Sequence, residues 1–167
     1  ESWLKKINRD NNISLYIHIP FCNSLCYFCG CHTNIANTYS PIEYYVKSLL
    51  REINILSQKL ENKFNVSHIH FGGGTPSILM GAELWMIMQS IKEKFNILEN
   101  CQIAMEIDPR FYRKNLTIIL NAFNFNRISL GVQDFSQNVQ TLINRTQSFE
   151  TTKEIVTHFR KNNIHNI

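Results

Sequence analysis

The 167-residue sequence has no long hydrophobic run and no block of charge of one sign. No apolar stretch approaches the roughly 18 residues that a membrane span needs, and residues 1–12 lack the apolar core of a signal peptide. The 17 basic and 13 acidic residues are scattered, so no track for nucleic-acid phosphates can be identified. We therefore predict a cytoplasmic protein that binds neither a membrane nor a nucleic acid.

Linkers rich in proline or glycine and low-complexity segments are also missing, since the chain contains only four prolines and six glycines. Hydrophobic residues make up 44% of the sequence and charged residues 18%, which is typical of a globular domain and excludes disorder. These absences predict a single domain over residues 1–167.

Alternating apolar residues predict four strands, at residues 14–20, 66–71, 102–108 and 127–133. Helical spacing predicts intervening helices over 40–60, 83–95, 113–123, 136–143 and 151–162. The first helix should begin with Ser40 as N-cap, and Glu43 would complete a capping box. Residues 162–167 read as a turn entering a fifth strand, so we expect the chain to stop in mid-architecture.

Strand and helix alternate four times, which predicts an α/β fold with a parallel sheet. A (β/α) barrel, or part of one, is the natural closure of about four βα units, and a doubly wound open sheet is the alternative. In both folds the chemistry lies at the carboxyl ends of the strands. The unusual residues follow each predicted strand in turn: the cysteine loop, Gly72–Pro76, Glu106 with Asp108, and Gln133 with Asp134.

The triple glycine after the second strand permits close backbone approach, so it can cradle a phosphate or an adenosyl group or simply form a tight turn. It lacks the Lys-Ser/Thr ending of a P-loop and the spaced glycines of a dinucleotide fingerprint. Both nucleotide-binding classes are therefore disfavoured.

Four of the five cysteines lie within "HIPFCNSLCYFCGCHT", residues 18–33: Cys22, Cys26, Cys29 and Cys31. In a reducing cytosol such spacing favours metal ligands or catalytic thiols over disulfides. Structural zinc usually takes two separated pairs of ligands, and no second pair is present. An iron–sulfur cluster accepts thiolates from one short loop, and CxxxCxxC would bind three irons and leave the fourth open. Cys31 is then a fourth ligand, as in an electron carrier, or a neighbour of the cluster.

The stretch "CNSLCYFC", with an aromatic residue before its last cysteine, resembles the radical S-adenosylmethionine superfamily. Four ordered blocks more narrowly resemble the oxygen-independent coproporphyrinogen III oxidase family: "YIHIPFCNSLCYFCGC", "HIHFGGGTPSIL", "MEIDPR" and "ISLGVQDFSQNVQTLINRTQ". The likeness runs from Ser14 to Gln147. A related haem chaperone is the nearest alternative, but it usually lacks the thiol of Cys31 and has QSF where this chain has Gln133-Asp134-Phe135. A non-enzymatic iron–sulfur electron carrier is the alternative from another class.

The resemblance implies a partial radical SAM barrel in which Cys22, Cys26 and Cys29 bind a 4Fe-4S cluster and S-adenosylmethionine chelates its fourth iron. The residues that match the family's contacts to S-adenosylmethionine are Tyr16, Gly73, Gly74, Thr75, Glu106, Gln133 and Arg145. Cys31 matches the family's extra cysteine, which is not a cluster ligand. Together with Tyr16 it would take part in catalysis.

The implied reaction is the oxidative decarboxylation of coproporphyrinogen III to protoporphyrinogen IX in anaerobic haem biosynthesis. A 5′-deoxyadenosyl radical removes hydrogen from propionate side chains, which lose carbon dioxide and become vinyl groups. The implied partners are the porphyrinogen and an electron donor such as a flavodoxin or a ferredoxin, and the protein would be a monomer. On this resemblance we expect residues 1–167 to form the N-terminal part of the core, without the C-terminal domain, and to be inactive alone.

Overall fold

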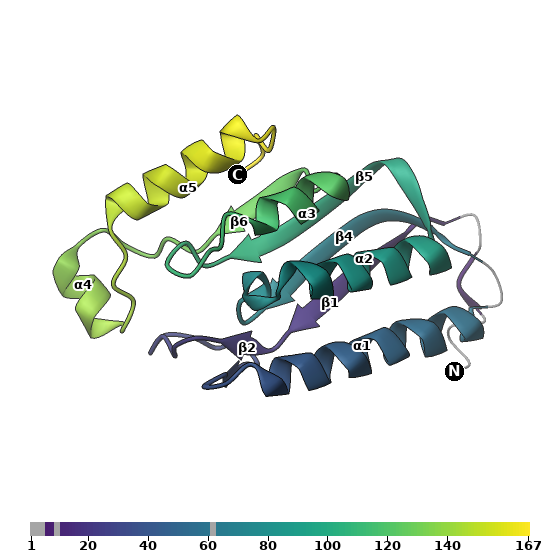
Figure 1. Cartoon of the computed structure of the whole chain (residues 1–167), viewed down its shortest axis with the longest axis horizontal. Helices are drawn as coiled ribbons and strands as arrows, with labels where there is room; N and C mark the ends of the chain where they lie inside the picture. The colour runs from purple at the N-terminus through teal and green to yellow at the C-terminus, as the bar shows by residue number, and fades with distance from the viewer. Residues whose placement is uncertain (1–5, 9–10, 61–62) are drawn as a thin grey trace.

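The computed structural model describes residues 6–8, 11–60 and 63–167 as an α/β fold (Figure 1). Residues 1–5 and 9–10 of the N-terminal stretch that we assessed for a signal peptide lie outside the described residues. The main sheet has four parallel strands in the order β1 (Ile13–Ile19), β4 (Asn65–Gly73), β5 (Asn96–Ile107) and β6 (Arg127–Leu130). All four strands of the sequence-based prediction are therefore present and parallel.

Five helices connect or follow these strands: α1 (Ser40–Lys59), α2 (Gly81–Lys94), α3 (Leu116–Ala122), α4 (Gln137–Leu142) and α5 (Phe149–Lys161). Helices α1, α2 and α3 lie side by side on one face of the sheet (Figure 1). The strands lie in the sheet in the same order as in the chain. A (β/α) barrel has this strand order. A doubly wound sheet reverses its order and carries helices on both faces. The structure therefore excludes that alternative, although the described strands do not close into a barrel.

The chain returns to the edge of the sheet after α5. Asn166 forms a parallel bridge with Arg127, and its carbonyl accepts the backbone N–H of Ile128 at 2.9 Å. The preceding turn places Asn163 in the left-handed region with φ 64°. This geometry matches the predicted turn into a further strand beside β6.

The prediction for the start of α1 is wrong in two details, since Ser40 is not the N-cap and Glu43 completes no capping box. Tyr39, not Ser40, is the N-cap, Ser40 is the first helical residue, and no side chain caps this end of the helix. The phenol of Tyr39 instead donates to Glu83, and Glu83 also accepts the backbone N–H of Met80 at 3.0 Å. Tyr39 thus links the beginning of α1 to the beginning of α2. The pKa of Tyr39 is raised, first by burial and second by the hydrogen bond to Glu83.

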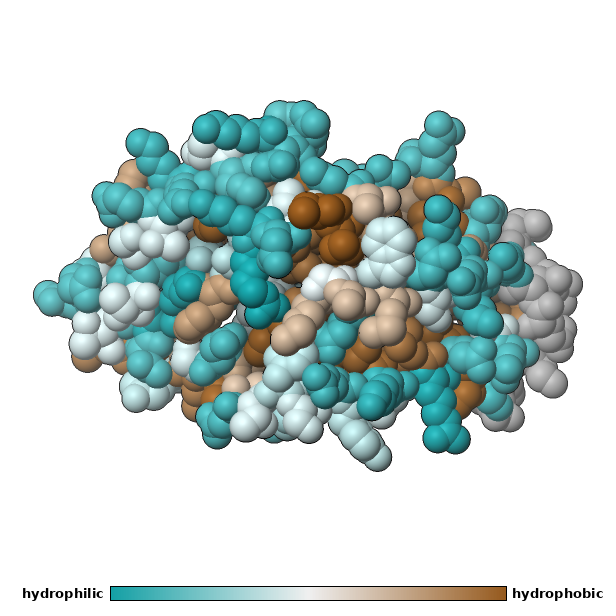
Figure 2. Space-filling view, viewed as in Figure 1, coloured by the Kyte–Doolittle hydropathy of each residue, from teal (hydrophilic) through white to brown (hydrophobic). Residues whose placement is uncertain are grey.

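Side chains alternate between the two faces of the sheet, as the pleat requires. The face beneath the helices is apolar, and its fully buried members include Ile19, Ile69, Phe71 and Met105. Histidine, tyrosine and glutamate side chains occupy the other face, where they remain partly exposed. On the helical side of the molecule, Figure 2 shows a largely hydrophilic surface with some apolar side chains exposed in its centre. None of the described helices has the length and apolar character of a transmembrane segment.

Candidate functional site

The carboxyl ends of the four strands open onto a cavity of about 280 Å³. It is lined by the cysteine loop, the glycine turn after β4, the ends of β5 and β6, and the segment after α4. Ten of the eleven predicted site residues line it: Cys22, Cys26, Cys29, Cys31, Gly73, Gly74, Thr75, Glu106, Gln133 and Arg145. Segments more than one hundred residues apart in the sequence therefore meet at one place.

The cysteine loop is held at both of its ends and at its middle. Two short strands, β2 (Phe21–Cys22) and β3 (Asn34–Ile35), pair in parallel and bring residues 23–33 back beside their starting point. Between them, the backbone N–H of Tyr27 bonds to the carbonyl of Ile143, and the Asn144 amide donates to the carbonyl of Leu25 at 2.7 Å. The loop is thus fastened to the end of α4, two residues before Arg145.

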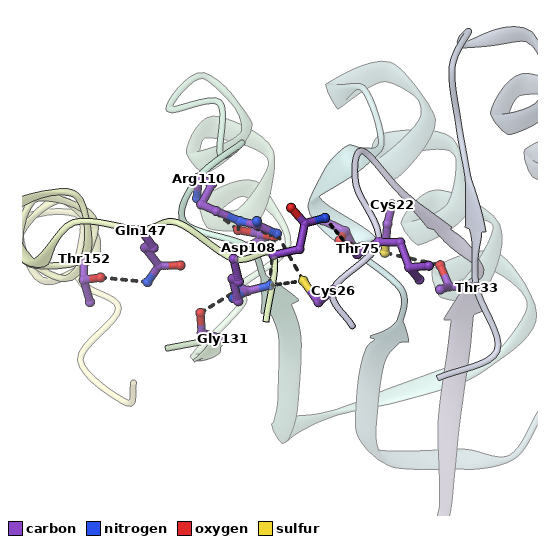
Figure 3. A network of polar contacts seen from close by, with 12 residues as sticks. Cys22, Cys26, Thr33, Thr75, Asp108, Arg110, Gly131, Gln147 and Thr152 are labelled. Atoms are coloured by element: carbon purple, nitrogen blue, oxygen red, sulfur yellow. Dashed lines mark hydrogen bonds and ion pairs between the residues drawn. The ribbon is translucent and has the colours of Figure 1, made fainter. Parts of the chain in front are cut away.

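Cys22 lies against the glycine turn. Its sulfur accepts hydrogen bonds from Thr33 Oγ1 at 3.2 Å and from Thr75 Oγ1 at 3.4 Å (Figure 3). A Cβ atom on Gly74 would lie 2.9 Å from that sulfur and 2.4 Å from Thr33 Oγ1. The absence of a side chain at Gly74 is therefore what lets the turn approach Cys22. Gly73 has φ 118°, which L-residues rarely adopt.

Cys26 is buried beside three charged side chains (Figure 3). Its sulfur accepts from Arg145 Nη1 at 3.4 Å and from Arg110 Nη2 at 3.6 Å. Both guanidinium groups also bond to the Asp108 carboxylate. Burial alone lowers the pKa of Arg110, but the hydrogen bonds and charge of Asp108, supported by Cys26, outweigh it and raise the pKa overall.

Arg145 comes from the loop after α4 and is 9% exposed. Its Nη2 donates to the carbonyl of Gly131 at 2.8 Å, and a Cβ on Gly131 would lie 2.7 Å from this nitrogen. Its buried Nε has no hydrogen-bond partner within the described part of the chain, and the same is true of Ser24 Oγ. Ser77 Oγ and Gln147 Oε1 are likewise without a partner in the described residues, but of these four residues only Ser24 and Arg145 line the cavity.

Tyr16 is the one predicted residue that does not line the cavity. It is 60% exposed, stacks on His70 with ring centroids 5.9 Å apart, and its hydroxyl lies 3.1 Å from His18 Nδ1. His70 Nε2 in turn lies 3.0 Å from Glu106 Oε1. Burial first, then the charges of Glu106 and Cys31, raise the pKa of Tyr16. Tyr16 thus belongs to the rim of the site.

Cys31 is exposed, whereas Cys26 is buried and Cys22 and Cys29 are half-buried. A hydrogen bond with Cys29 and then partial burial raise the pKa of Cys31. All five cysteines are free thiols in this structure. Cys101 is buried in the hydrophobic core, as a lone apolar thiol should be.

The donor set fits an iron–sulfur cluster better than a metal ion. Among the described residues, no three Cys, His, Asp or Glu side chains converge closely enough to hold a metal ion. Four thiols nevertheless line one cavity, and the sulfurs of Cys22 and Cys26 receive hydrogen bonds from neighbouring donors. A cluster is larger than an ion and takes one thiolate at each iron, so thiols spread around a cavity suit it.

Two comparisons identify the class of protein. The sequence profile of the Radical SAM superfamily matches residues 16–167, and this chain belongs to that superfamily. The oxygen-independent coproporphyrinogen III oxidase of Bradyrhizobium diazoefficiens is 39% identical over 158 residues, which are 95% of this chain and 35% of that protein. The enzyme of the same name from Pseudomonas aeruginosa is 40% identical over 146 residues, or 86% of this chain and 32% of that protein.

A solved structure of a radical SAM enzyme has the same fold as this chain. Coproporphyrinogen III oxidase from Escherichia coli, a radical SAM enzyme, superposes with a TM-score of 0.91 and 36% identity. The match covers 98% of this chain and 38% of that one. This chain therefore spans about a third of the length of the curated relatives that it matches.

Sequence reasoning overlooked the role of several residues in this cavity. In the sequence, Asp108 stands at a strand end without an evident function, and Arg110 stands out only as part of "MEIDPR". A charged residue that directly follows a buried strand, two positions from another charge, is the signal that could have indicated an ion pair. Thr33, Ser24 and Gly131 carry no such signal, because only folding brings them to the site.

Proposed function

We propose that this protein is an oxygen-independent coproporphyrinogen III oxidase, which converts coproporphyrinogen III to protoporphyrinogen IX by oxidative decarboxylation. The proposal is supported by relatives of that name that are 36–40% identical to nearly the whole chain. The observation that carries it is the cavity at the strand ends, which Cys22, Cys26 and Cys29 line together with the glycine turn, Glu106 and Arg145. On this proposal, residues 1–167 contribute part of the radical SAM core.

Cys22, Cys26 and Cys29 would hold three irons of a 4Fe-4S cluster. When bound, the cluster supplies the electron that cleaves S-adenosylmethionine to a 5′-deoxyadenosyl radical. The protein's own part is to place the cofactor, to exclude water and to keep the thiolates available. Thr33 and Thr75 serve the last purpose at Cys22, since each donates a hydrogen bond to its sulfur.

The remaining site residues would bind S-adenosylmethionine. Gly73 and Gly74 leave the backbone of the turn open to the methionine moiety, beside Thr75. Glu106 near the end of β5 and Gln133 in the loop after β6, which ends at Leu130 and not at the predicted residue 133, can accept from its ammonium group or bond its ribose hydroxyls. Arg145 can pair with its carboxylate through the free Nε. Tyr16, at the rim, would cover the cofactor.

Cys31 would act beside the cluster rather than as a ligand. It lies two residues beyond Cys29 and is exposed, so it can meet a substrate at the mouth of the cavity. The other partners proposed are coproporphyrinogen III and a flavodoxin or ferredoxin as electron donor. We place the protein in the cytoplasm, as a monomer.

The test is anaerobic reconstitution of the protein, in the form its gene encodes, with iron and sulfide. Decarboxylation of coproporphyrinogen III is then followed by chromatography of the oxidised porphyrins, with and without S-adenosylmethionine. We expect protoporphyrin only when S-adenosylmethionine and a reductant are both present. Cleavage of S-adenosylmethionine without decarboxylation, together with tight haem binding, would instead identify the related chaperone. A redox-active cluster that does not bind S-adenosylmethionine would indicate an electron carrier.

A further inference from the structure

Asp108 carries two arginines on one buried carboxylate. Its side chain is 7% exposed, and those of Arg110 and Arg145 are 12% and 10% exposed. Arg110 Nη2 lies 2.6 Å from Asp108 Oδ2, and Arg145 Nη1 lies 3.3 Å from the same oxygen. Two cations beside one anion leave a positive charge without a partner, and burying such a charge is costly.

Besides the Asp108 carboxylate, both cations reach the sulfur of Cys26, which lies beside Arg110 and Asp108 in Figure 3. Each guanidinium group directs one N–H at it, from 3.4 Å and 3.6 Å. A thiolate at Cys26 would complete a neutral group of two cations and two anions.

The two arginines are held very differently. Arg110 gives both its Nε and its Nη2 to Asp108, at 3.0 Å and 2.6 Å, and its backbone N–H bonds to Oδ1 at 3.1 Å. Arg145 reaches Asp108 only through Nη1, and its Nε is free. Arg110 thus gives most of its hydrogen bonds to one carboxylate, whereas Arg145 divides its bonds among Asp108, Cys26 and the carbonyl of Gly131.

We propose that Arg110, clamped by Asp108, is a positioning residue for Cys26 that raises the reduction potential of the cluster bound there. This inference rests on the proposed function, because it requires a cluster at Cys22, Cys26 and Cys29. Hydrogen bonds to the sulfurs and the local net charge are among the factors that set the potential of an iron–sulfur cluster. A fixed cation with an N–H directed at a ligand sulfur stabilises the reduced, more negative state.

The test is the reduction potential of the reconstituted cluster, measured by a titration monitored by electron paramagnetic resonance without S-adenosylmethionine. In Arg110→Gln we expect a shift to a more negative potential and an unchanged iron and sulfide content. The matched control is Arg127→Gln, which removes the same charge from an exposed residue at the opposite end of β6. Its potential should equal that of wild type.

If the reduction potential of Arg110→Gln equals that of wild type, the inference is wrong. It is also wrong if Arg110→Gln and Arg127→Gln shift the potential equally. Neither result contradicts the proposed function. If Arg110→Gln does not fold, the same potential is measured in Arg110→Lys. The lysine ammonium can still pair with Asp108, but it lacks the second N–H group that the arginine directs at the sulfur of Cys26. The potential should then shift in the same direction by a smaller amount, and an unchanged value contradicts the inference. A wild-type protein that holds no cluster overturns both proposals.

Discussion

At the scale of single residues, the four clustered cysteines are not equivalent. Cys22 and Cys26 each receive two hydrogen bonds at sulfur, from hydroxyl groups in one case and from guanidinium groups in the other. Cys31 lies on the exposed side of the loop and interacts with Cys29. The chain thus surrounds its proposed ligands with donors and leaves the extra thiol at the surface of the site.

This difference predicts opposite results for two serine substitutions. Cys26→Ser should lose most of its cluster, because a buried ligand is removed and Arg110 and Arg145 then face a neutral hydroxyl. Cys31→Ser should keep its cluster. Iron and sulfide analysis after anaerobic reconstitution measures both, and equal loss of iron in the two variants would show that the assignment of three ligands is wrong.

Arg145 allows a second prediction at this scale. Arg145→Ala should bind S-adenosylmethionine about 10- to 100-fold more weakly, since hydrogen bonds to charged groups contribute about 1.5–3 kcal/mol. Its iron content should match that of wild type. The affinity can be measured by equilibrium dialysis, with Arg160→Ala on the exposed side of α5 as the control for lost charge. An affinity equal to that of the control would remove Arg145 from the binding site.

At the scale of elements, the glycine turn after β4 is as important as the ligands. Gly74→Ala would place a Cβ 2.7 Å from the carbonyl oxygen of Phe21 and 2.4 Å from Thr33 Oγ1, so the turn and the cysteine loop must separate. We expect the free energy of unfolding to fall by about 1–3 kcal/mol, as for other overpacked sites, and the cluster to be held less well.

Gly30 offers a matched control within the same site. A Cβ there meets nothing within 4 Å, so Gly30→Ala should retain both stability and iron. Urea unfolding and iron analysis of the two variants decide the matter. Loss of iron in Gly30→Ala to the same extent as in Gly74→Ala would show that close packing of the turn is not the cause.

Helix α5 contributes a pH dependence far from the site. His158 Nε2 lies 2.7 Å from Thr117 Oγ1 of α3, and burial first and the charge of Lys114 second lower the pKa of His158 below 6.5. A depressed pKa means that the unfolded chain takes up the proton more readily. Stability should therefore be full above about pH 6.5 and decline as the pH falls below it.

Urea unfolding at about pH 7.5 and about pH 5.5 tests this expectation, since these values lie on either side of the ordinary histidine pKa. His158→Gln should show a smaller difference between the two conditions, because glutamine does not titrate. If the variant loses as much stability as wild type on acidification, other groups cause the pH dependence.

At the scale of the whole molecule, sequence reasoning located the strands well wherever they are buried on the helical face. β1 and β4 alternate apolar and polar residues, so their periods are visible in the sequence. The first half of β5 was missed, because residues 96–100 are largely polar and exposed, and they are in the sheet only through pairing with β4. Ser40 is not the N-cap because the helix begins one residue earlier than its sequence signal indicates, which makes Ser40 the first helical residue.

The sequence by itself determined the order of strands and helices, the glycine turn and the presence of closely spaced thiols, because these depend on local periodicity and on neighbours in the chain. It did not reveal the group of Asp108, Arg110, Arg145 and Cys26. These residues are up to 119 positions apart, and only the winding of the parallel sheet brings strand ends and loops to one edge. Local pattern thus selects the elements, whereas the electrostatic surroundings of the site are a property of the tertiary structure, since burial and charge pairing exist only after the chain has folded.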